Sequence, residues 1–178
     1  MINDGKPILD ASCGSRMFWF DKNNPMTDFM DIRDEVCELS DGQLCIVKPN
    51  IIGDFTNMPF PEKSYKMIVW DPPHLVWAGK KSNLYKKFGK MDDWRKDLKK
   101  GFDECMRVLD DYGVLIFKWS EIQLKTKTVI KALGQVPLFG HKTSRHCIWM
   151  AYMKIPKGGE ERKCNEKTKA APEKKLNE

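Results

Sequence analysis

A short apolar run that ends in an acid and two prolines constrains this chain more than any other feature. Met67-Ile68-Val69-Trp70 is typical of a buried strand, and Asp71-Pro72-Pro73-His74 follows it directly. Each proline fixes φ and lacks an N–H, so the strand stops there and presents the Asp71 carboxylate at its carboxyl end. Asp71 and the Pro72 carbonyl would then form an acceptor-rich rim for an exocyclic amino group, with the flat His74 ring against a base. A plain strand stop is the alternative interpretation.

A second motif lies upstream, at Pro7-Ile8-Leu9-Asp10-Ala11-Ser12-Cys13-Gly14-Ser15. It predicts a short buried strand, a turn of small residues and then a helix, a junction at which backbone N–H groups can face a ligand. A dinucleotide fingerprint would need G-x-G-x-x-G, and only Gly14 is present. The motif therefore disfavours a nicotinamide or flavin cofactor.

Two further acids follow candidate strands. Asp31 lies 21 residues after Asp10, at the end of Thr27-Asp28-Phe29-Met30, where an acid is placed to accept from ribose hydroxyls. Asp54 follows Ile51-Ile52-Gly53 and is suited to an adenine amino group. Each acid alone is more typical of a turn or cap, but three acids that end strands ahead of Asp71 form a pattern.

In this order the motifs resemble those of the class I S-adenosylmethionine-dependent methyltransferases, over roughly the first 155 residues. The closest resemblance is to the amino-methylating branch with an Asp-Pro-Pro-aromatic motif, although His74 replaces the aromatic residue and Ser15-Arg16 replaces a second glycine. The resemblance implies S-adenosyl-L-methionine as cofactor, with Asp10 and Gly14 near its methionine part. Asp31 would hold the ribose and Asp54 the adenine. The cofactor set that it implies is Asp10, Ala11, Cys13, Gly14, Asp31, Ile32, Asp54, Phe55 and Asp71, and the catalytic set is Asp71, Pro72, Pro73 and His74.

The alternation of strand and helix signals predicts an α/β fold, namely a doubly wound, mostly parallel, Rossmann-like sheet with helices on both faces. A helix is expected from residue 92 or 93 to Leu109, with Asp110 to Gly113 closing it. A buried strand follows at 114–117, and a second helix is expected from a Ser120/Gln123 capping box to Gly134. The last strand is expected at 147–153. In such a sheet ligands bind beyond the carboxyl ends of the strands, where all four acids would lie.

Composition fits one domain at residues 1–155, followed by a charged, disordered tail at 156–178. The six cysteines form no C-x-x-C pair and no ligand cluster with histidine, so we expect reduced thiols and no metal. The chain has no apolar stretch of membrane-spanning length and no signal-peptide profile, which predicts a cytoplasmic protein without a membrane partner.

The segment Lys80 to Lys100 carries the positive charge of the chain. Its nine lysine and arginine residues face three aspartates, and nine minus three gives +6, the net charge of the whole chain. Aromatic residues lie among them, which favours backbone neutralisation with base stacking over a merely solvated lysine face. The residues that we assign to nucleic-acid binding are Lys80, Lys81, Lys86, Lys87, Lys118 and Arg145.

These features together predict an N6-adenine methyltransferase acting on nucleic acid, more readily DNA than RNA, with the target base rotated out of a duplex. The stretch between Pro137 and Met153 leaves no room for a recognition domain. Either the segment from Trp77 to Trp94 reads the target, or specificity is low, or a specificity partner or a homodimer supplies target recognition. Three alternatives stay open. They are methyl transfer to RNA or a protein amide, a catalytically silent cofactor-binding module, and a nucleic-acid-binding protein without cofactor affinity.

Overall fold

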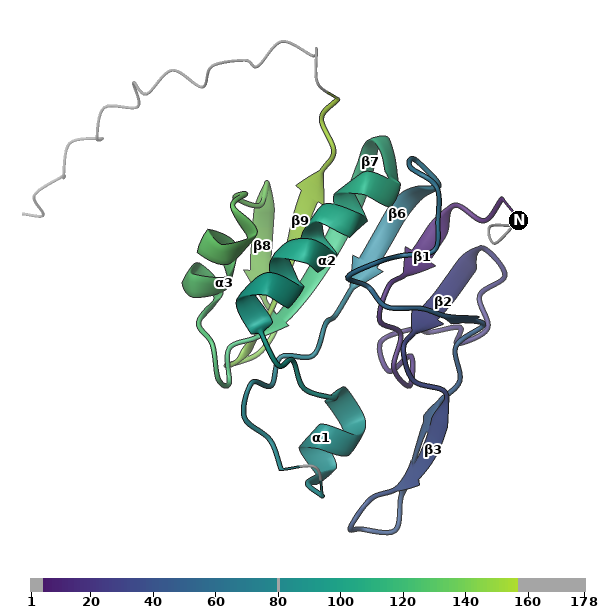
Figure 1. Ribbon diagram of the computed structural model, residues 1–178, viewed down its shortest axis with the longest axis vertical. Coiled ribbons are helices and arrows are strands. Elements are labelled where there is room, and N and C mark those ends of the chain that lie inside the picture. The colour runs from purple at the N-terminus through teal and green to yellow at the C-terminus, as the bar shows by residue number, and fades with distance from the viewer. Residues whose placement is uncertain (1–4, 80, 157–178) are drawn as a thin grey trace, which may run out of the picture.

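The computed structural model describes residues 5–79 and 81–156, which form a central sheet with a short hairpin and helices around it (Figure 1). The sheet has seven strands in the order β5-β2-β1-β6-β7-β9-β8. Their bounds are β1 Ile8–Asp10, β2 Thr27–Asp31, β5 Ile51–Ile52, β6 Tyr65–Trp70, β7 Leu109–Ser120, β8 Phe139–Lys142 and β9 Cys147–Met153. Five neighbouring strands, from β5 to β7, are parallel, and β9 runs antiparallel between β7 and β8.

The predicted α/β fold with a mostly parallel, Rossmann-like sheet is therefore confirmed. The chain order reverses at β1, between β2 and β6, and a reversal of this kind opens a crevice at the carboxyl ends of the strands. Asp10, Asp31 and Asp71 stand at or just beyond those ends. The sequence patterns thus place these three acids at one edge of the sheet, as expected.

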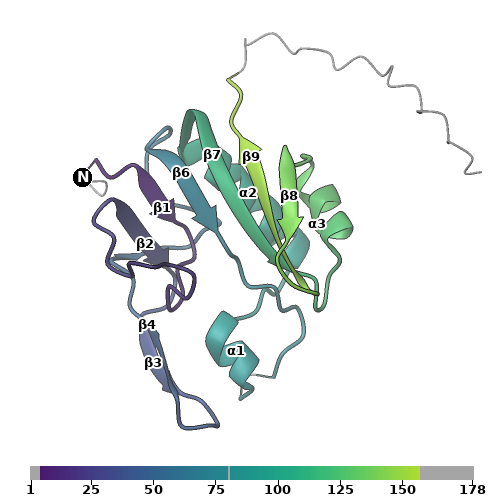
Figure 2. The ribbon, with the colours of Figure 1, turned by 180° about the vertical axis from the view of Figure 1, so that it is seen from behind.

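The expected helical layer on the second face is missing from the described residues. Helices α2 (Trp94–Val108) and α3 (Thr126–Leu133) lie on the same side of the sheet, and Figure 2 shows the opposite face without a helix. The segment after β1, where a helix was expected, forms a series of turns, with Gly14 and Arg16 at positive φ and Pro25 before β2. Two left-handed residues separated by one position cannot belong to a right-handed helix, so this prediction was wrong.

The predicted helix boundaries hold at three of four ends. Helix α2 begins after an Asp93 cap as expected, and it also ends as expected, at Val108 with Leu109 as its C-cap. Helix α3 ends at Gly134 in the left-handed conformation. The 110–113 segment, however, lies inside β7, and α3 begins only at Thr126. Gln123 does not cap that helix; Glu121 instead accepts a hydrogen bond from the Thr126 N–H at 3.0 Å.

A hairpin and a short helix were not predicted. Strands β3 (Glu35–Glu38) and β4 (Leu44–Val47) pair antiparallel, and helix α1 (Asn83–Phe88) packs beside them. Asp41-Gly42 between two alternating apolar runs is a hairpin signal, with Gly42 at φ +79°. The hairpin occupies the stretch between β2 and β5 where a second crossover helix would otherwise lie.

The main core lies between α2, α3 and the covered face of the sheet. Its largest buried side chains come from β6, β7 and β9, and include Trp70, Phe117, Trp119 and Tyr152. None of the helices in the described ranges is long and apolar enough to cross a membrane. The predicted tail lies, from residue 157 onward, outside the described residues.

Gly101 lets α2 pack closely against the sheet. A Cβ at this position would lie 2.6 Å from ring atoms of both Phe55 and Trp70. We therefore expect Gly101→Ala to lower the free energy of unfolding by about 1–3 kcal/mol, even though Ala has the higher helix propensity. Urea unfolding measures this, with Lys100→Ala on the exposed side of the helix as control. Equal or higher stability of Gly101→Ala would contradict the close packing.

Candidate active site

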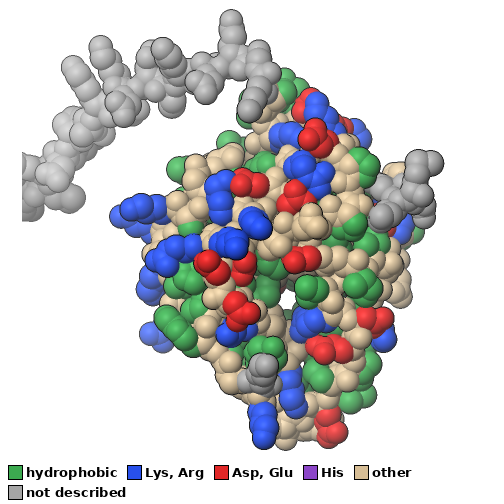
Figure 3. Space-filling view, viewed as in Figure 1, with side chains coloured by type: hydrophobic (Ala, Val, Ile, Leu, Met, Phe, Trp, Pro, Cys, Tyr) green, Lys and Arg blue, Asp and Glu red, His purple; other side chains and the backbone are tan. Residues whose placement is uncertain are grey.

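A pocket of about 270 Å³ opens where the carboxyl ends of β1, β2 and β6 meet α1. In Figure 3 the same face is hollowed between the sheet and the region of α1. The pocket is lined by the turn after β1, the end of β2, the segment after β5, the rim after β6, and α1 with the residues that follow it. The residues of the predicted sets that line it are Ala11, Cys13, Gly14, Asp31, Ile32, Phe55, Asp71, Pro73 and Lys87.

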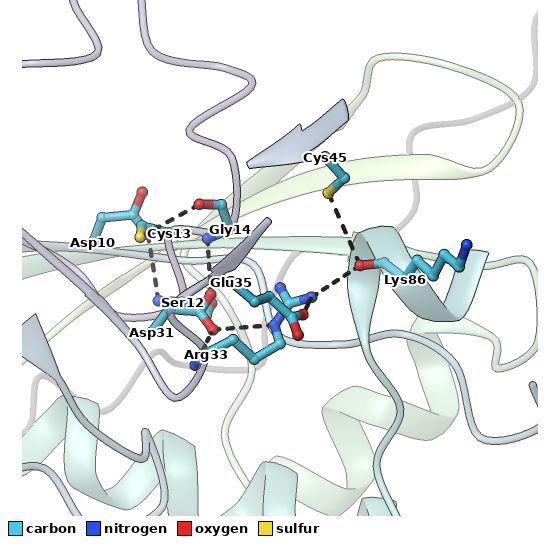
Figure 4. A network of polar contacts seen from close by, with 9 residues as sticks. All are labelled: Asp10, Ser12, Cys13, Gly14, Asp31, Arg33, Glu35, Cys45 and Lys86. Carbon is cyan, nitrogen blue, oxygen red and sulfur yellow. Dashed lines mark hydrogen bonds and ion pairs between the residues drawn. The ribbon is translucent and has the colours of Figure 1, made fainter. Parts of the chain in front are cut away.

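Asp31 is the polar centre of the pocket wall. Its carboxylate accepts hydrogen bonds from the Gly14 N–H at 2.9 Å, the Arg33 N–H at 3.0 Å and Arg33 Nε at 3.2 Å. Arg33 also donates to the Lys86 carbonyl at 3.1 Å, and Figure 4 shows it between Asp31 and α1. A carboxylate offers about four lone-pair positions, so Asp31 keeps about one for a ligand hydroxyl. Arg33 thereby ties the acid at the end of β2 to the helix that covers the pocket.

Two predicted cofactor residues lie away from the pocket lining. Asp10 is fully buried behind the turn after β1, where its carboxylate accepts from Trp19 Nε1 at 2.7 Å. Burial raises the pKa of Asp10 to about 7, against the hydrogen bond from Trp19, which lowers it. Asp54 closes a turn by accepting from the Thr56 N–H at 2.8 Å, and its neighbours Gly53 and Phe55 line the pocket instead.

The Asp71-Pro72-Pro73 rim adjoins this pocket. The Asp71 N–H donates to Ser12 Oγ at 3.2 Å, which fixes the rim against the turn after β1. The Asp71 carboxylate forms an ion pair with Lys118. Burial raises the pKa of Asp71, and the Lys118 charge opposes that rise. No described residue donates a hydrogen bond to the Pro72 carbonyl.

His74 does not present a free ring face to the pocket. It is 7% exposed, and its ring centroid lies 4.9 Å from that of Phe88, which lines the pocket. Burial and the nearby Lys118 charge lower the pKa of His74 to about 4, so the ring is neutral at pH 7. The prediction that His74 lies directly against a base is therefore corrected, because in this structure Phe88 is the ring on the pocket side.

The segment after the rim is held by Gln123, from the turn that follows β7. Gln123 Oε1 accepts from the Val76 and Trp77 N–H groups at 2.7 and 2.9 Å, and its Nε2 donates to the Trp77 carbonyl at 2.7 Å. The Trp77 ring remains 72% exposed. A fixed backbone thus presents an exposed aromatic ring three residues after His74.

The residues predicted to bind nucleic acid do not form one surface. Lys87 lines the pocket, Lys86 donates to the Glu38 carbonyl of the hairpin, and Lys118 is paired inside the rim. Lys81 and Arg145 are exposed, and Lys80 lies outside the described residues. Figure 3 shows blue side chains gathered over α2 and α3 and again near α1, with acidic side chains among them. No group of His, Cys, Asp or Glu in the described ranges could hold a metal ion.

Several lining residues were not assigned to the pocket from the sequence. They are Ser12, Ser15, Met17, Phe18, Arg33, Gly53, Tyr85, Phe88, Gly89 and Lys90. Residues 85, 88 and 90 belong to the basic and aromatic segment that we assigned to nucleic-acid binding, but in the structure they line the pocket, from α1 and the residues that follow it. Arg33 carried no signal of its own, because its role depends on contact with a helix 53 residues away in the sequence.

No family model matches the chain, and no curated protein matches it. Solved structures do share its fold. The PH0226 protein from Pyrococcus horikoshii OT3 is similar at a TM-score of 0.57 and 13% identity, over 83% of this chain and 82% of that one. The N-methyltransferase NodS from Bradyrhizobium japonicum WM9 is similar at a TM-score of 0.52 and 13% identity, over 84% and 85% of the two chains.

The [4+2]-cyclase SpnF is similar at a TM-score of 0.51 and 10% identity, over 86% of this chain and 76% of that one. Structures described as methyltransferases recur among the matches. The chain thus shares its α/β fold with structures described as methyltransferases. Since a cyclase shares it, the reaction has to be argued from the site.

Proposed function

We propose that this protein is an S-adenosyl-L-methionine-dependent methyltransferase that acts on an exocyclic amino group of a nucleic-acid base, with N6 of adenine in DNA as the first candidate. The observation that carries the proposal is the position of Asp71 and Pro72. They stand beside a pocket at the carboxyl edge of the sheet, and Asp71 is one of the residues that line it. An acceptor pair at this place suits an amino group that must meet a cofactor in the pocket.

The residues of the pocket fit the expected cofactor. Asp31 offers a remaining acceptor position for a ribose hydroxyl, and Ile32 and Phe55 supply apolar surface for a purine. Cys13, Gly14 and Ser15 line the pocket from the turn after β1, in which Ser12 Oγ accepts from the Asp71 N–H, and a methionine moiety would lie against this turn. S-adenosyl-L-methionine, when bound, supplies a methyl group already activated by positive charge, so the chain needs no nucleophile of its own.

The task of the chain is then alignment. Asp71 and the Pro72 carbonyl accept hydrogen bonds from the amino group, which keeps the nitrogen lone pair directed at the methyl group instead of delocalised into the ring. Water takes the proton that the nitrogen loses after transfer. Phe88 and the exposed Trp77 supply the aromatic surface for a base that has left its stack. We further propose a cytoplasmic location, consistent with free cysteines throughout the described residues.

Incubation with methyl-labelled cofactor tests the proposal. The acceptors are unmethylated single-stranded DNA, duplex DNA, RNA and a glutamine-rich peptide, followed by nucleoside and amino-acid analysis. We expect N6-methyladenine in DNA. Label in RNA or in the peptide would show that the acceptor is not DNA, although the reaction would still be methyl transfer to an amino group. Cofactor binding by calorimetry without label in any acceptor would indicate the silent module, and salt-sensitive DNA binding without cofactor affinity would leave only a nucleic-acid-binding protein.

A further inference from the structure

Lys118 forms a largely buried ion pair with the catalytic candidate Asp71. Strand register places Trp70 opposite Phe117, so the next residues along the two parallel strands, Asp71 and Lys118, stand side by side. Their side chains are 17% and 21% exposed and form a direct ion pair between Asp71 Oδ2 and Lys118 Nζ. Lys118 was predicted to contact a phosphate, but this pairing places it within the rim.

Two aromatic rings enclose the ammonium group. Lys118 Nζ lies 5.7 Å from the ring centroid of Phe18 and 6.0 Å from that of Trp149. The two rings meet edge to face at 5.3 Å between centroids and 89° between planes. Such surroundings limit access of water and hold the cation in one place, so its hydrogen bonds are stronger than those of a surface lysine.

The pair keeps hydrogen-bonding capacity that the fold does not use. Among the described residues, Asp71 Oδ1 accepts from no donor, and Lys118 Nζ donates only to Asp71. An ammonium group has three N–H donors, so two remain. Asp71 lines the pocket and Lys118 does not, so the pair extends outward from the pocket. One acceptor and one donor therefore stand next to each other at the rim, with no net charge.

We infer that Lys118 is the specificity-determining residue of this site, and that with Asp71 it reads an amino group next to a hydrogen-bond acceptor on the Watson–Crick edge of a base. The inference rests on the proposed function and narrows its substrate class. Asp71 would accept from the amino group while Lys118 donates to the neighbouring atom. Adenine offers this edge at N6 and N1, and cytosine offers it at N4 and N3.

The same pairing excludes other amines. On the Watson–Crick edge of guanine an N1–H lies beside the N2 amino group, where it would face the Lys118 donor and leave both groups unsatisfied; the N3 acceptor lies on the other side of N2, toward the sugar. An alkylammonium has no neighbouring acceptor, and the neutral pair offers it no net attraction. A site with buried polar groups made for one edge rejects substrates that leave those groups unpaired, which is where large specificity ratios originate.

The test pairs a variant with a substrate analogue. Wild type, Lys118→Met and Lys118→Arg are assayed on single-stranded oligonucleotides that contain one adenine or one 1-deazaadenine, in which a C–H replaces N1. We expect the wild type to prefer adenine by roughly 100-fold in kcat/KM. Lys118→Met should retain less than about one tenth of that preference, and Lys118→Arg should retain most of it because guanidinium keeps a donor. Lys66→Met, at the opposite end of the sheet, is the matched charge control.

Each outcome decides one point. An adenine preference that is the same in wild type and in Lys118→Met overturns the inference, because the coupling between Lys118 and N1 would be absent. Methyl transfer by the wild type with equal rates on adenine and guanine oligonucleotides overturns it as well. No transfer by the wild type to nucleic acid or to the glutamine peptide overturns the proposed function itself. Calorimetry with the cofactor and thermal melting confirm that the Lys118 variants are folded.

Discussion

Replacing Asp71 with alanine is expected to reduce methyl transfer by at least about 1,000-fold while leaving cofactor affinity within about threefold of the wild type. The variant removes the carboxylate that would accept from the target amine, and it also leaves Lys118 without its partner in an aromatic enclosure. The backbone contact from the Asp71 N–H to Ser12 remains possible for alanine, so the pocket wall should persist. Single-turnover transfer and calorimetric titration with the cofactor measure the two effects separately.

The control for this prediction is Asp110→Ala. Asp110 lies at the beginning of β7, at the other end of the sheet, and pairs with exposed Lys66. Its removal deletes a carboxylate without touching the rim, and surface pairs of this kind contribute little stability. Transfer at more than one tenth of the wild-type rate by Asp71→Ala would remove Asp71 from the mechanism. Loss of cofactor binding together with transfer would instead make Asp71 a residue of the pocket wall.

The part of the site that sequence analysis could predict is the part built from strand ends. Short apolar runs ending in Asp10, Asp31 and Asp71 are visible without a structure, and parallel strands bring such ends to one edge. The bounds of β9, Cys147–Met153, also follow from local pattern alone, because its side chains are mostly large and apolar, and β2 ends one residue beyond the expected run.

The part that could not be predicted depends on contacts between distant segments. The packing of His74 against Phe88, and the tie from Arg33 to the Lys86 carbonyl, join residues whose sequences carry no mark of each other. The strand-and-turn motif at 7–15 also predicted a helix after β1, but Gly14 and Arg16 adopt positive φ and the chain turns instead. Local backbone conformation overrode that prediction, and the face of the sheet seen in Figure 2 carries no helix among the described residues.

Asp10, unlike Asp31 and Asp71, does not line the pocket but is buried against Trp19. Its carboxyl group is fully buried, and its pKa of about 7 lies well above the ordinary value of 3.8. An acid whose folded pKa is raised makes the folded state less stable as pH rises from about 4 to about 7, and the full cost remains above pH 7. The difference of about 3 pKa units corresponds to at most about 4 kcal/mol.

We therefore expect Asp10→Asn to gain free energy of unfolding relative to the wild type by about 2–4 kcal/mol between pH 5 and pH 8. Asparagine stays neutral throughout, and its carbonyl can still accept from Trp19 Nε1, although it loses one acceptor position. Urea unfolding of both proteins at several pH values measures the gain as a difference of slopes, so a constant offset from the lost acceptor does not affect it. Parallel stability curves for the two proteins would mean that Asp10 ionises as an ordinary aspartate. Unchanged cofactor affinity in Asp10→Asn would separate this buried acid from Asp31, which lines the pocket.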